Sequence, residues 1–319
     1  MKLLFLSSGS RNLLLTELQK ANQEIEIYCA DCDHLAPTLH DVFPSFVVPK
    51  ITDENYLDTV LEICEQNQIM GVCPLIDPEI SVIAANSSLF LEKHIIPFVS
   101  DIETVTQCFD KWSFSKYCEE KNIPVVKTYN YKEAKEKLKN EELFFPLFVK
   151  PRNGSASQGI GRVNHFKELS NFYKKDHQII IQKFIEGEEF GVDIYFDYYT
   201  GQPSSMGMKK KLKMRSGETD KAVTVYDQSI VNLIHKLTKF FTFKGPVDID
   251  IFKIGNEYFL SEINPRFGCG YPLSLAAGAD FTQNMVDNLS GRQSQKNNQF
   301  QVGVYMMKYF SMKVWNPYE

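Results

Sequence analysis

The sequence has no long apolar run and no excess of basic charge. No stretch in its 319 residues approaches the roughly 18 apolar residues that a membrane-spanning helix needs. Lys and Arg number 35 against 40 Asp and Glu, so the net charge of −5 gives no support for binding nucleic acid or an anionic membrane. The apolar run at residues 3–6 is too short for the core of a signal peptide. We therefore expect a cytoplasmic protein.

Cysteine is used without any sign of disulfides or a metal cluster. The seven cysteines are an odd number, and most lie in apolar stretches, which is typical of reduced, buried thiols. Cys29 and Cys32 form a C-x-x-C motif, which raises a redox or zinc alternative. Cys29 ends a predicted strand and no second cysteine pair follows, so the structural interpretation is favoured.

With 43% apolar and 24% charged residues, the composition is that of a globular chain long enough for two or three compact units. Within the first hundred residues, short apolar runs alternate with helical patterns, which predicts a parallel sheet with crossover helices. Ligands of such sheets bind beyond the carboxyl ends of strands. The segments 8–10 and 74–79 occupy such positions, but the Gly-containing turn at 8–10 does not form a G-x-G-x-x-G motif. Predicted strands lie at residues 3–6, 25–29, 46–48, 70–74 and 97–99.

The remainder of the chain begins with helical spacing at 101–121 and then becomes rich in strands. A break at Asn122-Ile123-Pro124 precedes a predicted strand at 125–128 and a helix at 132–139. Further strands are predicted at 147–150, 160–163, 179–182, 190–196, 204–215, 221–225, 247–253, 258–263 and 303–310. Further helices are predicted at 166–174, 229–240 and 281–289.

One predicted hairpin carries oxygen ligands. A turn at Gly255-Asn256 would bring Asp250 level with Glu262, and Asn264 shares the face of Glu262 because strand side chains alternate. Carboxylate and amide oxygens suit Mg²⁺. Arg266, two residues on, could hold a phosphate. The alternative is an ordinary hairpin with an exposed polar face.

A second segment is rich in small residues. Lys150 ends a predicted strand, and the loop at 152–161 contains Ser155, Ser157 and Gly159. Such a loop allows backbone N–H groups to surround phosphate oxygens, and a lysine adds charge. It is not a Walker A motif, because no Gly-Lys-Ser/Thr follows. A plain flexible hairpin loop is the alternative.

A third segment runs from an apolar strand at 179–182 into Glu189. Its backbone could face an adenine edge, and Glu189 could accept hydrogen bonds from ribose hydroxyls. Taken alone, this segment is better explained as a simple strand and turn.

Taken in order, these three segments resemble the ATP-grasp enzymes, and in particular short relatives of the carbamoyl-phosphate synthase large subunit. The resemblance covers nearly the whole chain. It implies an α/β protein with an α+β body, in which an N-terminal Rossmann-like parallel sheet (the pre-ATP-grasp domain) precedes the ATP-grasp fold. We expect a division into residues 1–100, a linker and lid at 101–185, and a metal-bearing C-terminal part at 186–319.

The resemblance also implies a role for individual residues. Lys111 and Lys150 correspond to phosphate-binding residues, and Ser155, Ser157 and Gly159 to the phosphate lid. Gln182 with the backbone of Lys183 and Phe184 corresponds to the adenine edge, and Glu189 to the ribose ligand. Asp250, Glu262 and Asn264 are the implied metal ligands, with Asp248 as second choice, and Arg266 is the implied phosphate clamp.

This chain departs from the pattern at two places. Gln182 stands where many members have Glu, although an amide carbonyl still accepts from an adenine amine. The loop at 155–159 has fewer glycines than in some members. Basic residues alternate in the run 209–215, which fits either a solvated strand or attraction of an anion. We favour function for Lys211 and Arg215, the latter near the transferred phosphate.

The function implied is an ATP-dependent, ADP-forming ligase that joins a carboxylate to an amine through an acyl phosphate. ATP and two Mg²⁺, replaceable by Mn²⁺, are the implied cofactors. The alternatives are another carboxylate- or bicarbonate-phosphorylating enzyme and a nucleotide-binding module without turnover. We expect small-molecule substrates, no nucleic acid and no membrane, and leave a homodimer open. Candidate substrate residues are Asp77, Glu79, Gly268, Gly270 and Tyr271.

Overall fold

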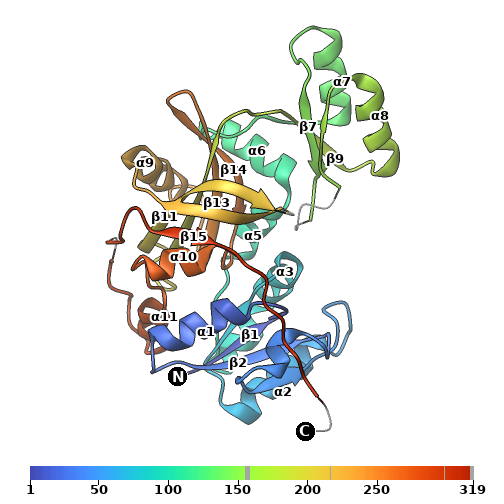
Figure 1. Ribbon diagram of the computed structural model, residues 1–319. Helices are drawn as coiled ribbons and strands as arrows, with labels where there is room; N and C mark the ends of the chain where they lie inside the picture. Colours follow the sequence, from blue (N-terminus) through green and yellow to red (C-terminus); the bar gives the residue numbers. More distant parts are fainter. Residues whose placement is uncertain (155–158, 216, 298, 317–319) are drawn as a thin grey trace.

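Three β-sheets follow one another along the chain, with helices packed around them (Figure 1). The computed structural model describes residues 1–154, 159–215, 217–297 and 299–316. The third sheet lies centrally, with the first sheet on one side and the second in a separate lobe on the other (Figure 1). Within the described ranges, no helix is long and apolar enough to cross a membrane.

The first sheet is parallel, as predicted. It contains β1 (Lys2–Leu6), β2 (Glu26–Asp31), β3 (Ser45–Val47), β4 (Gly71–Pro74) and β5 (Ile96–Pro97) in the order β3-β2-β1-β4-β5. Its helices are α1 (Asn12–Ala21), α2 (Tyr56–Asn67), α3 (Asp77–Ala85), α4 (Ser87–Glu92) and the short 3-10 helix η1 (Pro37–His40). The chain leaves β1 toward one edge and returns to β4 on its other side. The carboxyl ends of β1 and β4 therefore border the crevice where sheets of this type bind ligands.

The two faces of the first sheet are buried against different parts of the chain. Leu4 and Leu6 pack on the side of α2 and α3, whereas Leu3 and Phe5 point the opposite way. That second face is covered by α1 and by residues near the other end of the chain, in α10 (Tyr271–Ala276) and α11 (Thr282–Leu289). The first sheet thus shares a core with the C-terminal part.

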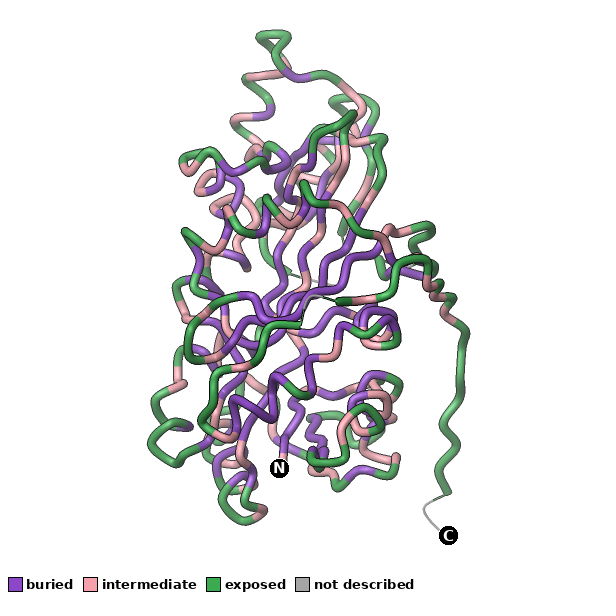
Figure 2. The backbone as a smooth tube through the Cα atoms, turned by 90° about the vertical axis from the view of Figure 1, so that its left-hand side faces the viewer, coloured by how far each residue is buried: buried purple, intermediate pink, exposed green. Residues whose placement is uncertain are grey.

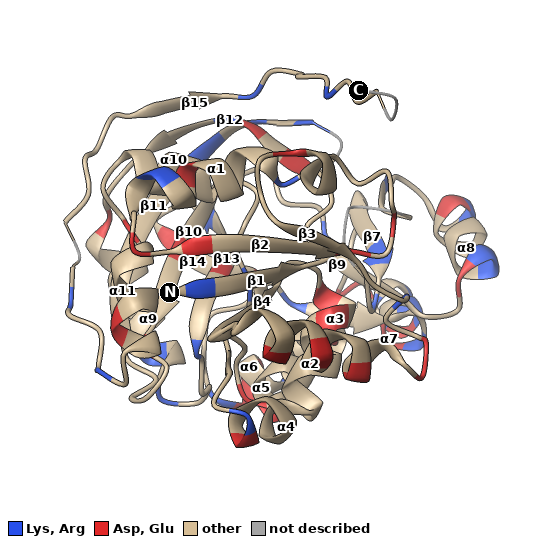
Figure 3. Ribbon diagram, turned by 90° about the horizontal axis from the view of Figure 1, so that it is seen from below, with Lys and Arg blue, Asp and Glu red and all other residues tan. Residues whose placement is uncertain are grey.

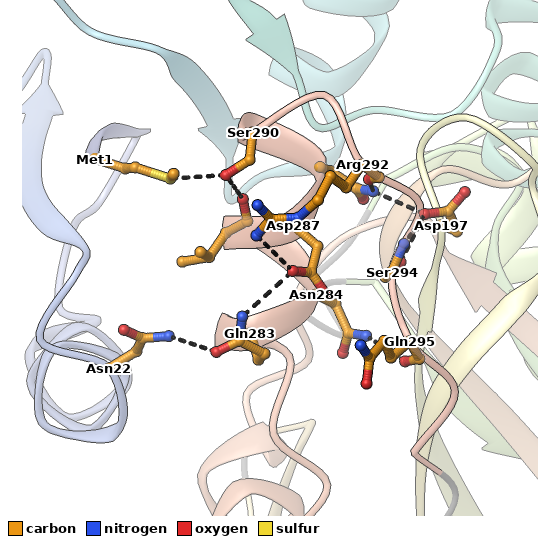
Figure 4. Close-up of polar contacts among 12 residues, drawn as sticks. Met1, Asn22, Asp197, Gln283, Asn284, Asp287, Ser290, Arg292, Ser294 and Gln295 are labelled. Carbon is orange, nitrogen blue, oxygen red and sulfur yellow. Dashed lines mark hydrogen bonds and ion pairs between the residues drawn. The ribbon is translucent and has the colours of Figure 1, made fainter.

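Polar contacts around α11 reinforce this junction (Figure 4). On one side, the Ser290 hydroxyl lies 3.9 Å from the Met1 sulfur, and Asn22 donates to Gln283 at 3.4 Å. On the other side, the backbone N–H of Ser294 donates to Asp197 at 2.7 Å. The helix is therefore held from both the first and the third sheet.

The second sheet is antiparallel and forms a small lobe. It contains β6 (Thr128–Asn130), β7 (Leu147–Pro151), β8 (Gly161–Val163) and β9 (Ile179–Lys183) in the order β6-β9-β7-β8. Helices α7 (Tyr131–Lys139) and α8 (Phe166–Lys175) cover one face and share a core with Leu147, Val149 and Ile181. A capping box at Asn130 and Glu133 fixes the start of α7.

The third sheet is antiparallel and has six strands. They are β10 (Glu188–Phe196), β11 (Pro203–Arg215), β12 (Glu218–Thr224), β13 (Gly245–Ile254), β14 (Glu257–Asn264) and β15 (Tyr305–Met307), in the order β14-β13-β10-β11-β12-β15. Helices α5 (Ile102–Phe109), α6 (Lys111–Glu120) and α9 (Gln228–Leu237) complete the helices of the described chain. Residues of α6 and α9 share the core on one face of this sheet. In Figure 2, the central strands are mostly buried and the chain after β15 is mostly exposed.

One predicted strand is wrong. Residues 125–128 do not form a strand: Val125 makes an isolated bridge to Leu260, and β6 begins only at Thr128. The backbone at this point forms hydrogen bonds with β14 instead. The Val126 N–H donates to the Leu260 carbonyl at 2.8 Å, and the Leu260 N–H donates to the Pro124 carbonyl at 3.0 Å. The division at residues 100 and 185 stays a prediction, although α6 packs with the third sheet.

Candidate functional site

Six of the functional residues expected from the sequence lie on one face of the third sheet. Residues of β10, β13 and β14 alternate between two faces. One face is apolar and includes Val192, Ile249 and Ile263 in the core. The other face carries the polar set, which we call the polar face. Its members are Glu189, Asp193, Lys209, Lys211, Asp248, Asp250, Glu262 and Asn264.

The hairpin of β13 and β14 has the register that the sequence predicts. Asp250 pairs directly with Glu262, and Asp248 pairs with Asn264. The turn is at Gly255-Asn256, as expected. An irregularity after Asp250 shifts the pairing beyond it, but leaves the ligand pairs aligned. The three candidate metal ligands therefore meet at one end of the hairpin.

Lys211 lies at the centre of the polar face. Its Nζ is 2.6 Å from Glu189 and 2.6 Å from Asp250, and its side chain is only 6% exposed. Burial raises the pKa of both carboxyls, and Lys211 opposes the shift. The two acids raise the pKa of Lys211 despite its burial, so the lysine stays charged.

Gly191 provides the space that Lys209 needs beside Lys211. It lies on β10 between β11 and β13 and pairs with both Lys209 and Asp250. A Cβ at this position would lie 3.0 Å from Lys209 Cε and 3.5 Å from Lys211 Cε. A side chain here would obstruct the lysines that cross β10. The sequence analysis missed this residue, although a glycine inside a strand is a recognisable signal of close approach.

Lys150 and Lys111 approach the polar face from outside the third sheet. Lys150, at the end of β7, has its Nζ 3.5 Å from Glu262 Oε2, and Lys111 Nζ is 4.0 Å from the same oxygen. Lys111 also donates to the Gly154 carbonyl at 2.6 Å. Burial raises the pKa of Glu262, but the lysines and Arg266 outweigh it and the net pKa is lowered. Burial lowers the pKa of Lys111.

Arg266 connects the polar face to the first sheet. Its Nε donates to Asp77 Oδ1 at 2.8 Å, and an Nη donates to Asn264 Oδ1 at 3.3 Å. Asp77 begins α3, directly after β4. The structure thus places the expected phosphate clamp in an ion pair with one of the candidate substrate residues.

The expected adenine edge lies on β9. The buried Gln182 amide donates to the Thr128 hydroxyl at 2.8 Å, which fixes the side chain with its nitrogen toward Thr128. Lys183 pairs with Leu147 through the backbone, and the Phe184 N–H donates to Pro146 at 3.3 Å. Ser155 and Ser157 lie outside the described residues. Gly159 has a φ of +68°, which suits glycine.

Two expected residues are not brought together with this set. Arg215 lies at the end of β11, 3.1 Å from Asp220, with its guanidinium over the Phe310 ring. Tyr271 is fully buried in the core: its hydroxyl donates to Ala279 at 3.1 Å and accepts from the Phe281 N–H at 2.8 Å. The burial of Tyr271 is explained by its packing in the core. Its contact with a substrate stays a prediction.

The polar face also contains a buried ion pair that the sequence analysis did not predict. Lys209 bonds Asp193, and both side chains are 2% exposed. Ser274 on α10 also donates to Asp193. Cβ atoms at Gly270 and Gly268 would lie 2.9 Å from Lys209 Cε and 2.6 Å from the Asp248 carboxyl carbon. These two glycines make room for charged side chains, which is a different role from the predicted backbone contact with a substrate.

The donor set of the polar face fits a hard divalent cation. Among the described residues, no three His, Cys, Asp or Glu side chains are arranged as a metal site. The candidate set differs from such a group, because Asp250 and Glu262 supply two carboxylates but the third donor, Asn264, supplies an amide oxygen. All three are oxygen ligands, as Mg²⁺ prefers.

Comparison with known proteins agrees with this geometry. Residues 108–270 match the ATP-grasp domain family, and residues 3–98 match the PylC-like N-terminal domain. The chain belongs to the ATP-grasp family. The predicted resemblance and fold are thereby confirmed.

Its similarity to individual proteins is more distant. The carbamoyl phosphate synthase large chain of Clostridium acetobutylicum is 24% identical over 74% of this chain, which spans only 24% of that protein. The D-alanine–D-alanine ligase of the same organism is 23% identical, over 73% of this chain and 72% of the ligase. Among solved structures, N5-carboxyaminoimidazole synthetase from Staphylococcus aureus, complexed with ADP, has a TM-score of 0.74 at 16% identity, covering 94% and 79% of the two chains.

Replacing Lys211 by Met is expected to reduce the free energy of unfolding by about 2 kcal/mol, because it leaves two partly buried carboxylates without a cation. The measurement is urea unfolding at pH 7. Lys210→Met is the matched control: this neighbour lies on the opposite face of β11, and its partly exposed side chain pairs with the exposed Glu188, so its loss should cost about 1 kcal/mol or less. Equal stability of the two variants would contradict the interpretation.

Replacing Glu79 by Gln is expected to change how stability depends on pH. Burial raises the pKa of Glu79 from 4.5 to about 7, so the folded protein holds its proton more tightly than the unfolded chain. Stability conferred by that proton is complete below pH 4.5 and is lost as the pH rises toward 7. The free energy of unfolding of Glu79→Gln minus that of wild type should therefore increase by about 3 kcal/mol from pH 4.5 to pH 8. The measurement is urea unfolding at the two pH values. A pH-independent difference would rule this out.

Proposed function

We propose that the protein is an ATP-dependent, ADP-forming carboxylate–amine ligase that makes an amide or peptide bond through an acyl phosphate. Membership of the ATP-grasp family and the similarity to a D-alanine–D-alanine ligase over most of both chains support the proposal. The observation that carries it is the register of β13 and β14, which aligns Asp250 with Glu262 beside Lys150, Lys111 and Lys211.

The proposed reaction has two steps. A substrate carboxylate oxygen attacks the γ-phosphorus of ATP, and the bond to ADP breaks to give an acyl phosphate. The amine nitrogen then attacks the acyl carbon, loses a proton and displaces inorganic phosphate. Phosphoryl transfer needs mainly positioning and charge neutralisation, so no covalent catalyst is required.

In this proposal, ATP lies between the second sheet and the polar face. Gln182 with the backbone of Lys183 and Phe184 faces the adenine, and Glu189 accepts from the ribose. Lys150 and Lys111, whose charges Glu262 balances in the structure, turn to the phosphates when nucleotide binds. Ser155, Ser157 and Gly159 cover the phosphates, and Lys211, Arg215 and Arg266 hold the transferred group.

The same proposal assigns the metal ligands. Asp250, Glu262 and Asn264 would hold Mg²⁺, which when bound neutralises phosphate charge. We further propose that the site binds two Mg²⁺ ions and that Mn²⁺ can replace them. The division at residues 100 and 185, a cytoplasmic location and small-molecule substrates are also proposed, whereas the sequence leaves a homodimer open.

Replacing Glu262 by Gln, or Asn264 by Ala, is expected to lower the rate of ADP formation by about 10³-fold or more, because transition-state charge loses its stabilisation. The measurement is coupled ADP release with Mg²⁺ and a panel of amino acids, singly and in pairs. Glu257→Gln, an exposed acid at the start of the same strand, is the matched control. Removing Mg²⁺ with EDTA should abolish turnover.

The panel also separates the alternatives. Dependence of ADP release on both an acid and an amine supports the ligase. Turnover with bicarbonate or an acid alone supports another carboxylate-phosphorylating reaction, and nucleotide binding without turnover supports a binding module. Full turnover by Glu262→Gln and Asn264→Ala would show that the site assignment is wrong.

A further inference from the structure

Glu79, one of the candidate substrate residues, is a buried acid to which the two proposed reaction steps assign no role. It lies in the first turn of α3 and is only 1% exposed. Its Oε1 accepts hydrogen bonds from the Ser7 hydroxyl at 2.8 Å and the Tyr56 hydroxyl at 2.6 Å. Its Oε2 is buried and has no hydrogen-bond partner among the described residues. A carboxylate that has left water without a partner for one oxygen is costly.

The charges around Glu79 are also unbalanced. Within the described chain, neither Lys nor Arg forms an ion pair with it. The nearby groups that influence its charge are Asp31 at the end of β2, Cys73 on β4 and Tyr56 on α2. Each of these is neutral or negative. The missing partner of Glu79 is therefore a cation or a strong hydrogen-bond donor rather than an anion.

The position of Glu79 is that of a ligand site. Ser7 directly follows β1 and Glu79 follows β4, so they meet at the crevice between the carboxyl ends of these strands. Ser7 has a φ of +46°, an unfavourable value for a residue with a side chain, which occurs mostly where local structure requires it. Two residues before Glu79, Asp77 contacts Arg266, so the crevice adjoins the polar face.

We propose that the Glu79 carboxylate, held by Ser7 and Tyr56, binds the ammonium group of an amino-acid substrate through Oε2. The proposal rests on the proposed ligase function, because it places this amino acid in the crevice next to Arg266. It deepens that function by naming a substrate class. The acid or the amine substrate carries a free ammonium group, which Glu79 binds.

The geometry favours an ammonium group over a hydroxyl or an anion. An ammonium ion has three donors and a positive charge, so it supplies both the missing hydrogen bond and the missing counter-charge. A hydroxyl would supply only the first. Oε2 is closed to solvent, so binding of the amine requires a local rearrangement of the residues that cover this oxygen.

The test measures binding apart from chemistry. Isothermal titration calorimetry is carried out on the full chain with Mg²⁺ and a non-hydrolysable ATP analogue, using a panel of amino acids, each beside the same acid without its amino group. Wild type should bind at least one amino acid and bind its deaminated analogue more weakly. Glu79→Gln should weaken the affinity for the amino acid by about 10- to 100-fold and leave the affinity for the deaminated analogue unchanged.

Glu26→Gln is the matched control. Glu26 accepts from the Tyr28 hydroxyl at 2.9 Å and so repeats the tyrosine–glutamate contact at the amino end of the same sheet. This variant should bind like wild type. Tyr56→Phe, which keeps the charge of Glu79 and removes one hydrogen bond, should have an intermediate affinity.

A pH series gives a readout that a purely structural role would not change. Burial raises the pKa of Glu79 to about 7, and it raises those of Tyr56 and Cys73 so that neither ionises near neutrality. For an amine whose own pKa lies above 9, wild-type affinity should rise between pH 6 and 8, as Glu79 ionises. In Glu79→Gln this rise should be absent.

Three results would overturn the proposal: equal amino-acid affinity in wild type and Glu79→Gln, equal wild-type affinity for amino acids and their deaminated analogues, or no binding of any amino acid. Failure of the ligase function is distinguishable, because ADP release is measured separately. An amino acid that binds through Glu79 without supporting turnover would contradict the ligase and leave this site in place.

Discussion

The ion pairs of Lys211 with Glu189 and Asp250 are the constraint on which the centre of the structure depends. Three charged groups from β11, β10 and β13 meet on one face of a sheet, the lysine buried and the two carboxylates partly buried, and each favours the charged form of the others. These contacts fix the relative register of the three strands. Between these strands, β10 carries glycine at position 191, where a Cβ would crowd the neighbouring Lys209 at 3.0 Å.

The charges of the polar face come from all three sheets. Lys150 arrives from the second sheet and contacts Glu262 at 3.5 Å, while Asp77 arrives from the first sheet and contacts Arg266 at 2.8 Å. The third sheet supplies the acids between them. Figure 3 shows acidic and basic residues distributed over many elements of the ribbon. What distinguishes the site is the burial and pairing of its charges.

Local patterns determined what could be predicted from the sequence. The turn at Gly255-Asn256 and the alternation along two strands were sufficient to place Asp250 opposite Glu262. The pairing of Asp77 with Arg266 could not be predicted, because 189 residues separate them and no periodicity links the two segments. The basic run at 209–215 suggested an evenly alternating face, but Lys209 is buried against Asp193 and the strand becomes irregular beyond Lys211. Burial of a lysine depends on tertiary partners that a single strand does not reveal.

The core shared by the two ends of the chain has a consequence for synthesis on the ribosome. Leu3 and Phe5 lie against Phe281 and Met285, so one face of the first sheet is covered by residues made much later. About 180 residues separate the end of that sheet from α11, and at roughly 5–20 residues per second their translation takes about 10–40 s. For that interval the nascent chain exposes an apolar face that belongs inside the finished protein. The order of synthesis thus leaves this face of the first sheet without its C-terminal covering until α11 emerges.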